Sequence, residues 1–259
     1  MENLVAEYAH QSVQIENNRL DLGYSIRITE HLADTLFQEV DLGSMPASEL
    51  AKSKLSDVMP LFPNADANQV MELRNQVVAS QWVTQTALRK AGTAGLTEDE
   101  LKHLLTITIK ETNSEDIYRK GWGKRVAPGG YRQTPIRIRS NPLRIFPYHI
   151  EVPALMQRFF QWRDKAIKRG MHPLILACQA LVYFVHIHPF PDGNGRVSRL
   201  MMQDYMIRHG YIPVTLQGID REDYIRMIRN AQDGDPGEFV EKIVLTQLDA
   251  MITFRLRED

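Results

Sequence analysis

The sequence predicts a mainly α-helical fold with a single β-hairpin. Apolar residues recur at intervals of three and four along most of the 259 residues, which is typical of helices packed on a core. Strand-like alternation occurs in one region only, at about 131–148. We expect an N-terminal region with its connection, 1–66, and a core region, 67–259, that together form one compact unit.

The N-terminal third predicts three helices and one irregular connection. Helical spacing extends over 2–16 and again over 26–40. Residues 41–66 contain one glycine and three prolines, which favours a connection with a single short helix. A long helix is then predicted from about 68 to 90.

The hairpin divides the remaining helices. Thr97 is followed three residues later by Glu100, and this capping box predicts the start of a helix. Glycines and prolines become frequent after 121, and the alternation Ile136-Arg137-Ile138-Arg139 predicts the hairpin. Further helices are predicted at 152–168, 172–187, 197–209, 222–233 and 238–257.

Composition restricts the class of protein. The net charge of −1 gives no reason to expect nucleic acid as a partner. The single cysteine, Cys178, excludes an internal disulfide and fits a buried apolar position in a reducing compartment. The first ten residues lack a secretory apolar region, and the most apolar run, 173–185, is too short to span a bilayer. We therefore expect a cytoplasmic chain without a membrane segment.

The segment HPFPDGNGRVSR, 188–199, joins two predicted helices, the second of which starts near Arg196. Asp-Gly and Asn-Gly pairs are also common in simple turns. Here, however, Gly193 and Gly195 would let an anion approach the free N–H groups at a helix N-terminus. Arg196 and Arg199 lie three residues apart and would project from one face beside it. The segment predicts a phosphate-binding site.

Two more side chains supply groups for catalysis. His188 has the ordinary pKa for proton abstraction near neutrality, and Asp192 offers a hard oxygen ligand for magnesium. A competing hypothesis is a hydrolytic zinc site made from His172, His186, His188 and Asp192. A helix that ends at Ile187 would direct His186 and His188 to different sides, so we interpret His186 as a buried, hydrogen-bonded histidine.

Residues 188–199 resemble the signature of the Fic family, HxFx[DE]GNGRxxR, at every specified position. Fic proteins are mostly helical, and most characterised members transfer AMP from ATP to a protein hydroxyl. The resemblance implies that His188 deprotonates the target, that Asp192 coordinates magnesium or manganese, and that Arg199 binds the γ-phosphate. It implies that the α- and β-phosphates are held by Gly193, Asn194, Gly195 and Arg196. Doc-type relatives that phosphorylate their targets lack the second glycine, which is present here as Gly195.

A second short motif predicts control of the site. Residues 12–17, SVQIEN, match the family's inhibitory pattern [ST]xxxE[GN]. Ser12 and Glu16 lie four residues apart and would share one side of the first helix. A plain helix end with a solvated Glu16 is the alternative. The resemblance implies that Glu16 pairs with Arg199 and withholds it from the γ-phosphate.

The resemblance also implies contacts at the two ends of the substrate site. In relatives the hairpin acts as a flap that touches the nucleotide and can accept a target segment as an added strand; an ordinary edge hairpin is the alternative. The region of 221–235 resembles the family's adenine-contacting segment, although some relatives have paired tyrosines and an asparagine there. The implied nucleotide contacts are Ile136, Arg137, Ile138, Arg139, Tyr224, Ile225 and Gln232.

These observations favour an autoinhibited, magnesium-dependent protein adenylyltransferase with ATP as substrate. Its expected partners are proteins that offer a Ser, Thr or Tyr hydroxyl, and the chain itself through auto-AMPylation; a homodimer is left open. One alternative is a deAMPylase that uses Glu16 in the same site. Others are transfer from a different donor, such as UTP or CDP-choline, and a non-catalytic nucleotide-binding module.

Overall fold

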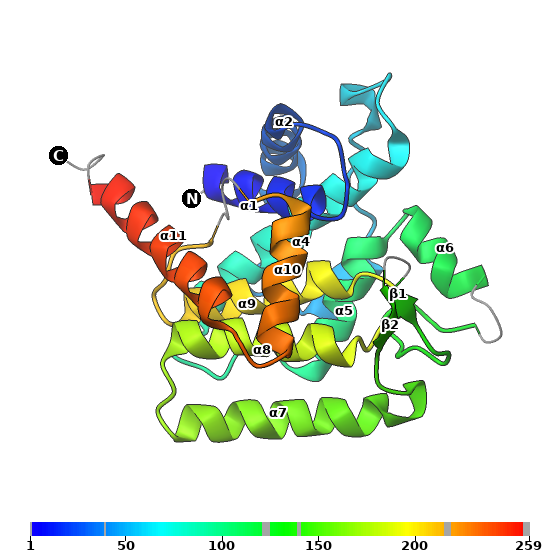
Figure 1. Cartoon of the computed structure of the whole chain (residues 1–259). Helices are drawn as coiled ribbons and strands as arrows, with labels where there is room; N and C mark the ends of the chain where they lie inside the picture. Colours follow the sequence, from blue (N-terminus) through cyan, green and yellow to red (C-terminus); the bar gives the residue numbers. More distant parts are fainter. Residues whose placement is uncertain (1, 39, 121–124, 139–140, 215–218, 256–259) are drawn as a thin grey trace.

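A buried central helix organises the protein (Figure 1). The computed structural model describes residues 2–38, 40–120, 125–138, 141–214 and 219–255. Helix α9 (Asn194–Arg208) is buried along nearly its whole length and packs against α8 (Pro173–Ile187) and α4 (Ala67–Arg89). A helix enclosed on all sides lies at the centre of a fold, so the segment that predicts a phosphate site opens the most buried helix.

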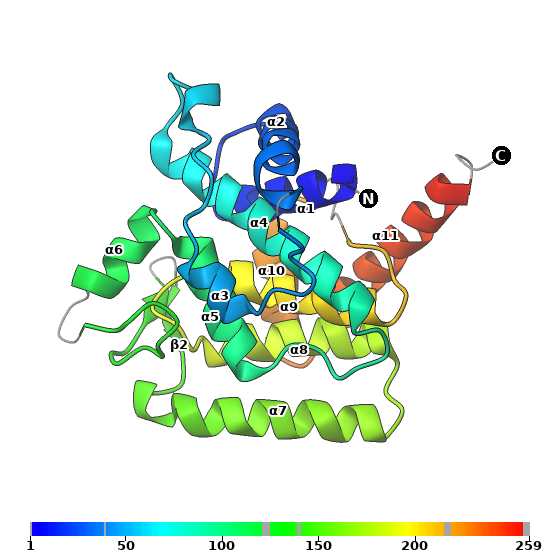
Figure 2. The same ribbon diagram turned by 180° about the vertical axis from the view of Figure 1, so that it is seen from behind.

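The N-terminal helices lie on the long helix α4 (Figures 1 and 2). They are α1 (Glu2–Gln14) and α2 (Leu22–Leu32), which continues into a π-helical turn, Ala33–Phe37. Helix α2 starts earlier than predicted because the Asp21 side chain caps it by accepting a hydrogen bond from Tyr24 N (3.3 Å). The N-terminal helices and α4 contribute to one hydrophobic cluster, whose members include Tyr8, Val13, Ile28, Leu32, Val77 and Trp82.

The connection after α2 contains α3 (Ala47–Lys52), as predicted, and a short 3-10 helix, Met59–Leu61. The capping box of Thr97 and Glu100 is present and starts α5 (Glu98–Ile109). Helix α6 (Asn113–Lys120) was not predicted, because it is short and has few apolar residues. Its acidic first turn was the available signal, since carboxylates favour a helix N-terminus.

Two short strands lie near α6 at one edge of the molecule (Figure 1). Strand β1 (Arg137–Ile138) pairs antiparallel with β2 (Asn141–Ile145), and Arg137 lies opposite Ile145. Arg139 lies outside the described residues.

The C-terminal half surrounds α8. A 3-10 turn, His149–Glu151, leads into α7 (Val152–Lys168), which packs on α8. Helices α10 (Arg221–Gln232) and α11 (Gly237–Arg255) also contact α8, and the end of α11 extends away from the other helices (Figure 1).

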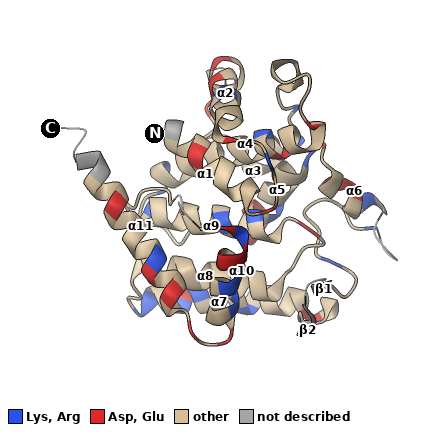
Figure 3. Ribbon diagram, turned by 45° about the horizontal axis from the view of Figure 1, so that its top comes forward, with Lys and Arg blue, Asp and Glu red and all other residues tan. Residues whose placement is uncertain are grey.

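The distribution of charged and apolar residues over the fold is as the composition predicts. Basic and acidic residues are interspersed over the helices in Figure 3. Among the described residues, no helix combines the length and the apolar character needed to cross a bilayer. Cys178 is a buried free thiol, and its burial raises its pKa to about 12, so it acts as an apolar core residue.

Candidate active site

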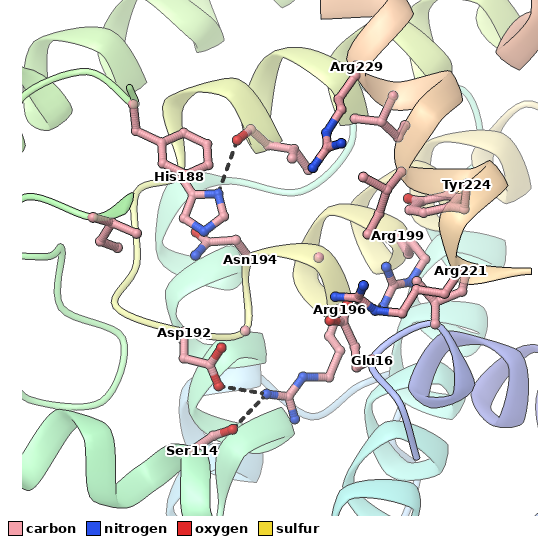
Figure 4. A pocket seen from close by; sticks show the side chains of 18 of the residues that line it. Glu16, Ser114, His188, Asp192, Asn194, Arg196, Arg199, Arg221, Tyr224 and Arg229 are labelled. Atoms are coloured by element: carbon pink, nitrogen blue, oxygen red, sulfur yellow. Dashed lines mark hydrogen bonds and ion pairs between the residues drawn. The ribbon is translucent and has the colours of Figure 1, made fainter. Parts of the chain in front are cut away.

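A pocket of about 430 Å³ lies where α8, α9 and α10 meet the turn after α1 (Figure 4). This volume is in the range of small-molecule sites. It brings together predicted residues from four distant parts of the chain: Glu16, Ile136, His188, Asp192, Gly193, Asn194, Gly195, Arg196, Arg199, Tyr224, Ile225 and Gln232. Arg137 and Ile138 are described through their backbone alone, so the predicted contacts of their side chains stay predictions.

His188 follows the last residue of α8 in a left-handed backbone conformation, with φ of +50°. Its Nδ1 lies 3.2 Å from Val185 O, which can only accept. Nδ1 therefore carries the proton, and Nε2 is left as the basic nitrogen. The ring stacks on Phe146 with centroids 4.2 Å apart. Burial lowers the pKa of His188 to about 4, so the imidazole is neutral and able to accept a proton at pH 7.

The loop between α8 and α9 is shaped by Asn194. Its Oδ1 accepts from Phe190 N and its Nδ2 donates to Phe190 O, both at 2.9 Å. Phe190 is fully buried beside Tyr131 and Phe184, as expected of an apolar anchor. With both ends of its amide occupied, the Asn194 side chain acts on the shape of the loop, and the predicted phosphate contact would have to come from the backbone at the α9 N-terminus.

Gly193 and Gly195, predicted to let an anion approach the helix N-terminus, are also needed for packing. Gly193 precedes α9 with φ of +85°, and a Cβ there would lie 2.5 Å from Leu105 Cδ1. A Cβ at Gly195 would overlap Glu16 Oε1 and lie 3.1 Å from Arg199 Nη1. Gly195 therefore leaves the space in which Glu16 reaches Arg199.

Arg196 is buried at the start of α9 and binds three groups. It donates to Thr108 O (3.3 Å) and Ser114 Oγ (3.0 Å), and pairs with Asp192 Oδ2 (3.3 Å). The Asp192 carboxylate stays partly exposed in the pocket. One accessible carboxylate beside a helix N-terminus fits magnesium, which usually binds proteins through one or two carboxylates and takes its other ligands from phosphate and water.

Arg199 is also buried, and it is bound by the first helix. Its Nε donates to Ser12 Oγ (2.9 Å), and its Nη2 donates to Ser12 O (2.7 Å) and Glu16 Oε1 (2.8 Å). The guanidinium also lies over the ring of Tyr224, 5.7 Å from its centroid. Burial opposes the charge on Arg199, but Glu16, Tyr224 and Tyr8 together outweigh it and raise the pKa of Arg199, with Glu16 contributing most. The predicted pairing of Glu16 with Arg199 is present in the structure.

The histidines of the competing zinc hypothesis do not come together. His172 precedes α8, and His188 follows it at the opposite end. The expectation that His186 is buried is wrong: this side chain is exposed, since it lies on the outer face of the last turn of α8, and it lines a different pocket. Among the described residues, no group of three or more His, Cys, Asp or Glu side chains could hold a metal.

Sequence reasoning missed four polar or charged residues of the pocket, Glu72, Ser114, Arg221 and Arg229, besides four apolar ones, Ile15, Phe146, Val185 and Ile228. Glu72 and Ser114 lie on α4 and α6, and nothing in the motif points to them. Arg221 and Arg229 flank Ile225 at intervals of four, and this spacing on one helical face was an available signal. Burial raises the pKa of the Glu72 carboxyl, which lies near Asp192.

Comparison with known sequences gives one family and a set of relatives. Residues 95–206 match the model of the Fic/DOC family. The protein adenylyltransferase Fic of Drosophila ananassae is 42% identical over 141 residues, which are 54% of this chain and 27% of that protein. That of Drosophila grimshawi is 34% identical over 141 residues, 54% of this chain and 28% of that protein. The matched region thus spans little more than a quarter of these relatives.

Solved structures share the fold over nearly the whole chain. A Fic domain containing signaling protein from Bacteroides thetaiotaomicron aligns with 94% of this chain and 80% of that chain, with a TM-score of 0.62 and 20% identity. Fic-1 from C. elegans aligns with 97% of this chain and 62% of that chain, with a TM-score of 0.64 and 18% identity. At these identities the similarity concerns the fold alone.

Proposed function

The chain contains a Fic domain of the Fic/DOC family, and from this premise we propose that it is an autoinhibited protein adenylyltransferase. It would transfer AMP from ATP to Ser, Thr or Tyr hydroxyls of target proteins and of the chain itself. One observation carries the proposal: a neutral histidine, a helix N-terminus and an arginine held by a carboxylate line the same pocket.

In the transfer step, His188 acts as general base. The target oxygen attacks the α-phosphorus, its proton passes to His188 Nε2, the bond between the α-phosphorus and the bridging oxygen breaks, and diphosphate leaves. Such transfers depend on positioning and charge neutralisation. Magnesium held at Asp192 would supply charge neutralisation on the phosphates. The backbone N–H groups that open α9 would bind phosphate oxygens, with Arg196 beside them.

Glu16 would inhibit by occupying Arg199. A guanidinium bound by a carboxylate and by Ser12 is not available to a γ-phosphate, and the carboxylate repels that phosphate. ATP then binds without the contact that aligns its α-phosphate for attack.

The two ends of the pocket would contact the base and the target. Tyr224, Ile225 and Gln232 on α10 are proposed to surround the base, and Ile136, which precedes β1, also lines the pocket. The edge of the β1–β2 pair would accept an extended target segment as an added strand, the role of a flap.

The decisive experiment compares wild-type protein, Glu16→Gly and Glu16→Gly/His188→Ala with α-labelled ATP and magnesium. We expect Glu16→Gly to raise auto-AMPylation by about two orders of magnitude or more, because Arg199 becomes free for the γ-phosphate. The added His188→Ala should abolish it while the protein still binds ATP. Equal labelling of wild type and Glu16→Gly would refute autoinhibition, and absence of labelling in both would refute AMP transfer.

A second candidate function is removal of AMP from modified proteins. The pair with Arg199 uses Glu16 Oε1, and the side chain remains 35% exposed, so the carboxylate can also hold a water in the pocket. Protein that has been labelled by Glu16→Gly and then freed of ATP is the substrate for this test. Release of labelled AMP by wild type but not by Glu16→Gly would support the hydrolase.

A further inference from the structure

A buried arginine outside the segment 188–199 binds the backbone around His188. Arg132 precedes β1 and is 1% exposed. Its Nε donates to His188 O (2.7 Å), and its Nη2 donates to Ile187 O (3.4 Å) and to Pro147 O. Its Nη1 donates to Thr134 O (3.3 Å). Among the described residues its acceptors are backbone carbonyls, and no carboxylate pairs with it.

The end of α8 explains how this charge is stabilised. The last carbonyl groups of a helix lack partners within the helix and form the negative end of its dipole. Ile187 O is one of these groups, and His188 O belongs to the residue that caps the helix. The guanidinium therefore caps α8, and five donors in a planar fork allow it to reach several carbonyls at once.

The same contacts hold His188 in its unusual backbone conformation. A residue with a β-carbon rarely adopts φ of +50° without support from its surroundings. Arg132 supplies that support on both sides of His188, because its backbone N also donates to Pro189 O (2.9 Å).

Arg132 also reaches the ring that stacks on the imidazole. Pro147, whose carbonyl it binds, directly follows Phe146, and Phe146 stacks on His188 with an interplanar angle of 29°. One guanidinium thus binds the backbone next to both rings of the stacked pair.

We infer that Arg132 is a positioning residue for transfer, which aims Nε2 of His188 by binding the backbone of both stacked rings. This inference rests on the proposed role of His188 as base. The Arg132 charge also disfavours the imidazolium form, whereas Asp192 and Glu16, the carboxylates that act on His188, favour it. The electrostatics therefore agree with the geometry.

The kinetic test uses Arg132→Met and Arg132→Lys in the Glu16→Gly background. We expect Arg132→Met to lower kcat about 100-fold with KM for ATP within about twofold, because the phosphate contacts of α9 are untouched. Arg132→Lys keeps the charge but not the planar fork of donors, so its kcat should lie between that of the Glu16→Gly parent and that of Arg132→Met. The matched control is Arg74→Met, which removes another fully buried arginine, one bound to Asn75 and Glu111 away from the pocket; it should lower Tm and leave kcat unchanged.

A second measurement does not depend on activity. In wild-type protein, the His188 and Phe146 rings should give a ring-to-ring NOE, and Arg132→Met should weaken it and raise the titration midpoint of His188. A folded Arg132→Met with an unchanged NOE and unchanged kcat overturns the inference. If Arg132→Met does not fold, the same two results for Arg132→Lys overturn it. A third outcome separates the two proposals. If Arg132→Met loses the NOE but Glu16→Gly itself shows no AMP transfer, the positioning contact is supported and the proposed function is refuted.

Discussion

Glu16 Oε1 lies 2.8 Å from Arg199 Nη2, although 183 positions separate the two residues. The guanidinium is almost fully buried, and Ser12 on α1 binds it beside Glu16, which lies in the turn after that helix. A buried charge without a partner is costly, so either a carboxylate or a phosphate must neutralise this arginine. The end of α1 and the turn after it thereby supply the partners of a residue that lies in the centre of the fold.

Replacing Ser12 should weaken this control without abolishing it. Ser12→Ala removes the hydrogen bond to Arg199 Nε but keeps the backbone contact and the pair with Glu16. One bond to a charged group is worth roughly 1.5–3 kcal/mol, so we expect auto-AMPylation to rise by about tenfold or more, but less than in Glu16→Gly. Ser12→Thr, which keeps the hydroxyl, is the control. Activation by Ser12→Ala as large as that by Glu16→Gly would contradict this account.

Because Gly195 leaves space for Glu16, substitutions at these two positions should have non-additive effects on the free energy of unfolding. Gly195→Ala places a Cβ against Glu16 Oε1, and we expect it to cost about 1–3 kcal/mol of unfolding free energy. In the Glu16→Gly background the cost should be smaller, because the overlapping atom is gone. Urea denaturation of the four proteins in this cycle measures the coupling. Equal costs in both backgrounds would show that Glu16 does not restrict residue 195.

The side-chain amide of Asn194 should stabilise the fold through its two hydrogen bonds to Phe190. Asn194→Asp keeps the acceptor for Phe190 N and loses the donor to Phe190 O, whereas Asn194→Ala loses both. We expect losses of roughly 1–3 kcal/mol for each unsatisfied buried group, with Ala more destabilising than Asp. Thermal unfolding checks this order. A stability equal to wild type in Asn194→Ala would reassign the side chain to ligand binding.

The dependence of kcat on pH should show no fall near pH 6.5, the value at which an ordinary histidine becomes protonated. The base acts when it is neutral, and burial lowers the pKa of His188 to about 4. Activity should therefore be lost only as the pH falls through that value. We expect kcat of Glu16→Gly at saturating ATP to stay level between about pH 5 and pH 8. Half-loss near pH 6.5, the usual histidine value, would show that His188 is not buried in the working enzyme.

Arg229 should contribute to nucleotide binding. It lines the pocket, and its Nε is buried without a partner among the described residues. Arg229→Met should raise KM for ATP about fivefold or more, since a cation that faces the ligand is lost. Arg226→Met on the same helix is the matched control, because Arg226 is exposed and paired with Glu238. Repeating the assay with GTP and UTP tests whether Arg229 also selects the base.

Much of the fold followed from local patterns. The spacing of apolar residues predicted most of the helices, and Thr97 with Glu100 marked the start of α5 because a capping box is a contact within one turn. Helix α6 was not predicted, because its few apolar residues give no periodic signal. His186 was wrongly placed in the core, since a position next to the end of α8 does not reveal which face is covered.

The order of groups in 188–199 could be read from the sequence, because a helix end, a loop and a helix start are encoded by neighbouring residues. The sequence also indicated that Glu16 belongs with Arg199. Which atoms meet became known from the folded chain: Gly195 makes room for Glu16, Asn194 closes the loop, and Arg132 binds the backbone of His188. These contacts join segments separated by tens of residues or more, or depend on side-chain directions, and close packing of several helices is what selects them.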